Sequence, residues 1–167
     1  MVLIAKVVLA LAASLVEPSQ ALSIIVERGP CLGECPVYRF QVSAGGGLFE
    51  GRGFTNVHGE QRFSITPKEW SAFQSALAFR PHGTEDITAG HPRCAQFATN
   101  HPSVSVTWSE AGRTDQLIFN FGCKDPQNDA MAQALAGMPD LLPVGKLIED
   151  RRLEGGAWDR RSVSPAK

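Results

Sequence analysis

The stretch Gly29-Pro30-Cys31-Leu32-Gly33-Glu34-Cys35-Pro36 is the most unusual part of this 167-residue chain. Its two cysteines have three residues between them and lie between prolines, with a short apolar run before them and another after them. Glycine and proline favour turns, whereas β-branched and aromatic runs are typical of strands. The stretch therefore predicts a cysteine-closed turn that joins two strands.

Residues on both sides of this turn have the pattern of strands. Leu22 to Glu27 is a β-branched run that we expect to form the first strand. Residues 38–43 alternate between apolar and polar side chains, which indicates a half-buried strand. Gly45-Gly46-Gly47 then turns the chain back, because glycine adopts positive φ without steric cost. Return strands are expected at 48–54 and 61–66.

A helix is predicted directly after these strands. Thr66-Pro67-Lys68-Glu69 combines a capping box with a proline at the first helical position. Trp70, Phe73 and Leu77 follow at helical spacing and predict one buried face. Arg80-Pro81-His82-Gly83 ends the helix.

The second half of the chain begins with its longest stretch without periodicity, residues 80–101. We expect this segment to be a loop that is functional, disordered or tied down, with a cysteine available as the tie. Residues 104–108 and 117–121 alternate and predict a second hairpin. Asp125-Pro126 predicts the start of a second helix, and residues 141–148 are apolar enough to dock on the body as a short helix.

Together these elements predict one α+β domain over residues 22–148. We expect an antiparallel β-sheet of about five to six strands, with two main helices packed on one face. Residues 1–21 are typical of a signal peptide, because Lys6 precedes an apolar run too short to span a bilayer and Ala21 offers a cleavage site. A retained N-terminal anchor is the alternative. Residues 149–167 are charged and poor in apolar side chains, so we expect a disordered tail.

The charge balance limits the kinds of partner. The chain has 16 basic and 17 acidic residues and a formal charge of −1. Proteins that bind nucleic acid or anionic membranes carry a basic stripe, so we expect neither partner, and membrane contact only through an uncleaved signal peptide. An unidentified protein or small molecule remains as the expected ligand.

The four cysteines are Cys31, Cys35, Cys94 and Cys123. An even number in an exported chain indicates disulfides, for which three connectivities exist. The short spacing favours Cys31 with Cys35, which leaves Cys94 to fasten the long loop to Cys123 at the end of a core strand. Neither pair can be deduced from the sequence alone.

Two chemical interpretations of the cysteines compete with structural disulfides. Redox motifs place two residues between their cysteines at the start of a helix, whereas Cys31 and Cys35 have three and precede a strand. His82, His91 and His101 surround Cys94, but their spacings match no zinc pattern. Two functions therefore stay only as alternatives: envelope thiol–disulfide redox through Cys31 and Cys35, and a metal-binding or hydrolytic site on the 80–101 loop.

No catalytic motif is present in the sequence. A nucleophile elbow, a zinc-protease helix and a phosphate-binding glycine loop are all missing. The histidines lie in polar, loop-like surroundings, and Glu85-Asp86 is an isolated acidic pair that we expect to be solvated. We therefore assign no catalytic, cofactor-binding or metal-binding residues and expect no cofactor.

The cysteine stretch also carries a family resemblance. Cys31 to Tyr38 resembles the hallmark of a bacterial family, domain of unknown function 6438, and the similarity extends to Gly51-Arg52-Gly53-Phe54 and the Thr66-Pro67 helix start. Pro92-Arg93-Cys94 and Phe121-Gly122-Cys123 resemble an exported subgroup. Glu34 departs from the family, which usually has a small residue there. The resemblance covers about residues 23–148 and implies this order of elements and an envelope location, but no activity.

These observations lead to one expected function. We expect a periplasmic or secreted binding or interaction module that is not an enzyme and is stabilised by two disulfides. The oligomeric state is left open by the sequence.

Overall fold

The structure is a computed structural model that describes residues 21–148. The predicted signal peptide, apart from Ala21, and the predicted C-terminal tail lie outside the described residues, and both remain predictions. None of the helices within residues 21–148 is long and apolar enough to cross a membrane.

The described chain contains nine strands, three α-helices and two 3-10 turns. The strands are β1 (Ser23–Arg28), β2 (Val37–Ser43), β3 (Gly46–Gly53), β4 (Gly59–Ser64), β5 (Thr84–Ile87), β6 (Gln96–Phe97), β7 (Ser103–Glu110), β8 (Arg113–Asn120) and β9 (Cys123–Lys124). The helices are α1 (Pro67–Ala76), α2 (Asp129–Gly137) and α3 (Val144–Ile148), with 3-10 turns at Pro126–Asn128 and Met138–Leu141.

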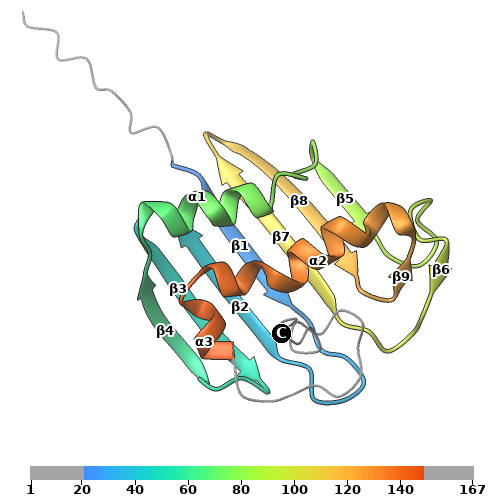
Figure 1. Cartoon of the computed structure of the whole chain (residues 1–167), viewed down its shortest axis with the longest axis horizontal. Coiled ribbons are helices and arrows are strands. Elements are labelled where there is room, and N and C mark those ends of the chain that lie inside the picture. Colours follow the sequence, from blue (N-terminus) through green and yellow to red (C-terminus); the bar gives the residue numbers. More distant parts are fainter. Residues whose placement is uncertain (1–20, 149–167) are drawn as a thin grey trace, which may run out of the picture.

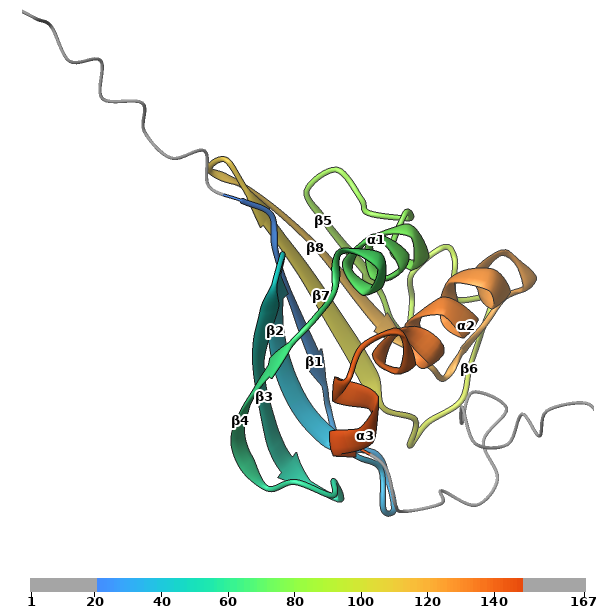
Figure 2. The same cartoon turned by 60° about the vertical axis from the view of Figure 1, so that its left-hand side comes forward.

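Seven of these strands form one twisted sheet in the order β4-β3-β2-β1-β7-β8-β5 (Figure 1). All neighbours are antiparallel except β5, which runs parallel to β8. β6 and β9 form a separate two-stranded sheet. The helices all lie against the same face of the large sheet, as Figure 2 shows from the side. The α+β class and the helices on one face agree with the sequence prediction.

The predicted sheet of five to six strands was too small. The missing strand is β5, in the segment expected to be a loop, and only Ile87 of its four residues is buried. A four-residue strand with one buried side chain has too little alternation to be recognised in a sequence. Its parallel pairing with β8 depends on contacts between segments far apart in the chain.

The core lies between the sheet and the helices. Alternate residues of the central strands are completely buried, among them Val26, Phe40, Val106, Leu117 and Phe119. The helices cover them with Phe73 of α1, with Leu77 at the C-cap of α1, and with Met131, Ala132 and Leu135 of α2. Burial of this apolar area is the main contribution to the stability of the fold.

The start of α1 follows the predicted capping chemistry, whereas the start of α2 does not. The Thr66 side chain accepts a hydrogen bond from the Glu69 backbone N–H, and the Glu69 carboxylate accepts one from the Thr66 N–H, so the capping box is complete. Asp125 caps the 3-10 turn Pro126–Asn128 instead of an α-helix. α2 therefore begins at Asp129, one turn later than Asp125-Pro126 predicts.

The two disulfides should stabilise this fold unequally. Cys94 and Cys123 are 29 residues apart in sequence, whereas Cys31 and Cys35 are 4 apart. The loss of loop-closure entropy in the unfolded chain then predicts that Cys94→Ser/Cys123→Ser lowers the free energy of unfolding by about 3.5 kcal/mol, and Cys31→Ser/Cys35→Ser by about 2 kcal/mol. Urea unfolding of the two double variants beside the wild type measures both losses. Equal losses, or the reverse order, would contradict this assignment.

Candidate functional site

The turn between β1 and β2 is closed by a disulfide and points into solvent. Cys31 is bonded to Cys35 with a Cα–Cα distance of 5.7 Å. Cys35 and Pro36 are buried, while the three residues between the cysteines are exposed. Leu32 is 77% exposed, against 43% for Phe97 and 36% for Leu141, the other two exposed large apolar side chains of the described residues. We call residues 31–35 the stapled turn.

Backbone hydrogen bonds hold the stapled turn against the segment that enters β7. The Leu32 N–H donates to the Asn100 carbonyl at 3.2 Å, and the Gly29 N–H donates to the Ser103 carbonyl at 2.9 Å. Gly33 has φ +129°, which a residue with a side chain rarely adopts. The stapled turn is therefore held by the disulfide and by the Leu32 hydrogen bond, and the Gly29 hydrogen bond holds the segment directly before it. The Leu32 side chain at its tip is exposed.

The long 80–101 segment is tied down through the second disulfide. Cys94 is bonded to Cys123 at a Cα–Cα distance of 4.8 Å. The Asn128 side-chain amide donates to the Arg93 carbonyl at 2.6 Å. Glu85 is half-buried and pairs with the Arg93 guanidinium at 3.0 Å, whereas its neighbour Asp86 is exposed. The structure contains the cysteine pairing that the sequence favours.

The histidines do not form a common site. His58 and His82 are exposed, whereas His91 and His101 are half-buried. Partial burial and the nearby Lys124 ammonium lower the pKa of His101. Within residues 21–148, no group of three His, Cys, Asp or Glu side chains is placed to hold a metal ion. The metal-binding alternative on the 80–101 loop therefore gains no support.

Asp115, near the start of β8, has a buried carboxylate that the sequence did not predict. Asp115 is 1% exposed. Its carboxylate accepts hydrogen bonds from the Gly83 N–H at 2.8 Å, Arg80 Nε at 2.6 Å and Arg113 Nε at 3.0 Å. The Gly83 carbonyl in turn accepts the Gln116 N–H at 2.8 Å. This network links the segment that follows α1 to β8, the strand with which β5 pairs.

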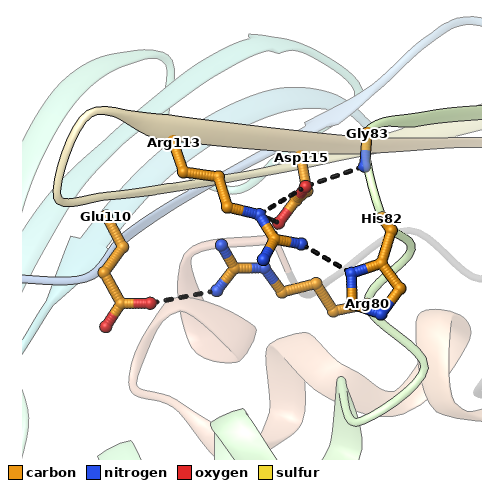
Figure 3. A network of polar contacts seen from close by, with 6 residues as sticks. All are labelled: Arg80, His82, Gly83, Glu110, Arg113 and Asp115. Atoms are coloured by element: carbon orange, nitrogen blue, oxygen red, sulfur yellow. Dashed lines mark hydrogen bonds and ion pairs between the residues drawn. The ribbon is translucent and has the colours of Figure 1, made fainter.

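Figure 3 shows that both arginines of this network also have a second partner. Arg80 Nη1 lies 3.3 Å from the Glu110 carboxylate, and Arg113 Nη2 lies 2.9 Å from His82 Nδ1. The donors are thus shared between neighbouring acceptors within the network. This arrangement is typical of a structural ion network.

The network lowers the pKa of Asp115 to about 2, from an ordinary value of 3.8. The hydrogen bond from the Gly83 N–H is the largest cause, and the bonds from Arg113 and Arg80 add to it, whereas burial opposes the shift. One sequence signal could have identified this residue. Asp115 has the same alternation phase as the buried Leu117 and Phe119, and a charged side chain in that phase needs buried partners.

The face of the sheet that the helices leave uncovered carries charges that neutralise one another. Glu27 pairs with Arg39 at 3.5 Å and with Arg52 at 3.4 Å, and Arg52 also pairs with Glu50 at 2.8 Å. Exposed pairs of this kind contribute little to stability. They do leave this face with local charge balance.

Two hollows accompany these features. An open hollow of about 670 Å³ lies over β2, β3 and β4, and its lining includes Gln41, Leu48 and Arg62. A smaller cavity of about 200 Å³ lies beside α1, β1 and β7, and its lining includes Trp108 and Arg80. The volume of the first falls in the range of ligand pockets, but it is open to solvent beside the outer strand β4. The Arg80 of the second is already bonded to the Asp115 network.

Comparison with known proteins gives one match. The family model described as "Domain of unknown function (DUF6438)" matches residues 22–141, which include the stapled turn, all nine strands and α2. No curated protein and no solved structure matches the chain.

The Asp115 network should make stability depend on acid pH. Because the folded protein holds the Asp115 proton more weakly than the unfolded chain, the network stabilises the fold fully above about pH 4, and this contribution is lost as the pH falls toward 2. Asp115→Asn should therefore lower the melting temperature at pH 7, by an amount that shrinks as the pH is lowered. Asp86→Asn, at an exposed position on β5, is the control and should change little. An Asp115→Asn deficit that is as large at pH 2.5 as at pH 7 would contradict the assignment.

Proposed function

The chain belongs to the family of the domain of unknown function DUF6438, and we propose that it is an exported binding module, without catalytic activity, that contacts a protein partner through the stapled turn. The observation that carries the proposal is the 77% exposure of Leu32 on a turn that a disulfide closes. When a partner removes an exposed apolar side chain from water, the free energy of the complex is lowered, which favours binding.

The rigidity of the stapled turn supports this role. Binding costs less conformational entropy when the contacting segment is already held in one shape. The Cys31–Cys35 disulfide and the Leu32 to Asn100 hydrogen bond supply that constraint before any partner arrives. Burying a leucine contributes about 1.5–3 kcal/mol, which corresponds to about 10- to 150-fold in affinity.

Export is the second part of the proposal. Disulfides persist in oxidising compartments, and residues 1–21 have the pattern of a signal peptide. A periplasmic or secreted location is consistent with two disulfides in one small domain. The proposal that the module is not catalytic is supported by its ion pairs. Asp115 is bonded to Arg80 and Arg113. On the uncovered face, ion pairs link four side chains to one another: Glu27, Arg39, Glu50 and Arg52.

The stapled turn can be tested with a photo-crosslinking amino acid at position 32, incorporated in the cell that naturally makes the protein. We expect one discrete protein adduct, and no such adduct from position 71, an exposed residue of α1. The adduct should disappear when Cys31 and Cys35 are both replaced by serine. No adduct at position 32, or the same adducts at both positions, would contradict the proposal.

Leu32→Asp separates binding from folding. Because Leu32 is exposed, this change should leave the free energy of unfolding within about 0.5 kcal/mol of the wild type. Affinity for the protein identified by crosslinking should fall at least about tenfold. If affinity is unchanged, Leu32 is not the contacting side chain.

A further inference from the structure

β4 is an outer strand of the sheet, and no other strand of residues 21–148 pairs with its free edge. In Figures 1 and 2 it forms the margin of the sheet, and no helix crosses its outer side. Every residue from Gly59 to Ser64 is exposed except Phe63, which is half-buried. An exposed edge strand presents unpaired backbone groups to which another strand can bond.

The pairing with β3 determines which backbone groups are unpaired. The Ile65 N–H donates to the Gly45 carbonyl at 3.2 Å, in line with the register of β3 and β4. Hydrogen-bonded pairs alternate along an antiparallel ladder, so Phe63 and Gln61 bond to β3. The N–H and C=O groups of Glu60, Arg62 and Ser64 therefore point away from the sheet.

The side chains of Glu60 and Arg62 also have no partner in this part of the chain. Within residues 21–148 neither forms an ion pair, although Glu27, Glu50 and Arg52 on the same face are all paired. Glu60 lies directly opposite Glu50 of β3. Like charges directly opposite one another destabilise a pair of strands, so an incoming cation beside Glu60 would be favourable.

We infer that β4 pairs with β4 of a second copy of the chain, antiparallel about a two-fold axis through Gln61. This register places Glu60 opposite the partner's Arg62 and Arg62 opposite the partner's Glu60, with both backbone hydrogen bonds exchanged in each of these two pairs. The seven-stranded sheets of the two copies then join into one continuous sheet. This dimer does not depend on the function proposed for the stapled turn.

The charges select this register over its neighbours. Backbone hydrogen bonds between the two copies can form only where residues whose N–H and C=O groups point away from β3 lie opposite one another. The two-fold axis can therefore shift only between a few positions along β4. An axis through Glu60 brings two glutamates together, and an axis through Arg62 brings two arginines together. Edge charges commonly prevent pairing by this kind of repulsion. Only the axis through Gln61, between them, brings opposite charges together in both positions.

A charge exchange tests the inference by sedimentation velocity from about 10 µM to about 1 mM, the range suited to a small, weak interface. We expect the wild type to dimerise with increasing concentration. Glu60→Arg or Arg62→Glu alone should weaken the dimer at least about tenfold, because like charges then meet, and the double variant should restore it. A wild type that is monomeric throughout, or a double variant that is as weak as the single ones, would overturn the inference.

A disulfide test examines the register itself. Across the axis, Gln61 faces its own symmetry mate in a non-hydrogen-bonded pair with a Cα–Cα distance of about 4.5 Å, which lies within the range that a disulfide can bridge. Gln61→Cys should therefore give a covalent dimer on a non-reducing gel. Ser64→Cys is the matched control, because its symmetry mate lies about 20 Å away. Equal crosslinking of both variants, or none of Gln61→Cys, would overturn this register.

Discussion

The Cys94–Cys123 disulfide is the constraint on which the second half of the fold depends. It joins the segment between α1 and β7 to β9, which follows the sheet strand β8 in the chain. β5 and β6 in that segment have four and two residues, too few to be stable by themselves. Closing a loop of this length covalently lowers the entropy of the unfolded chain. The seventh strand of the sheet and the contact from Asn128 to Arg93 both lie in the region that this bond holds.

The helices cover only one face of the large sheet. Apolar side chains are buried between the sheet and the helices. On the uncovered face, most charged side chains form ion pairs. Two places at the rim of the sheet depart from this pattern. One is the stapled turn, with an exposed leucine, and the other is β4, where Glu60 and Arg62 lack partners among the described residues. Both are suited to contacts between proteins rather than to enclosing a small molecule.

The sequence predicted the elements whose signals are local. A β-branched run identified β1, alternation identified β2, and the Thr66 capping box marked the start of α1. β5 was missed because its position depends on β8, about thirty residues later in the chain, and its own residues alternate too little. Asp115 was missed because its partners Arg80 and Gly83 precede it by more than thirty residues. The periodicity of one segment does not predict which distant segment it will pair with.

The bonding state of the four cysteines in the protein as its own cell makes it tests an exported, disulfide-fastened fold most directly. Free thiols are blocked during lysis, and the purified protein is digested and mapped by mass spectrometry without reduction. An exported, disulfide-fastened scaffold predicts Cys31 linked to Cys35 and Cys94 linked to Cys123, with no blocked thiol. A blocked thiol at any of the four cysteines, or a link between the two pairs, would contradict it.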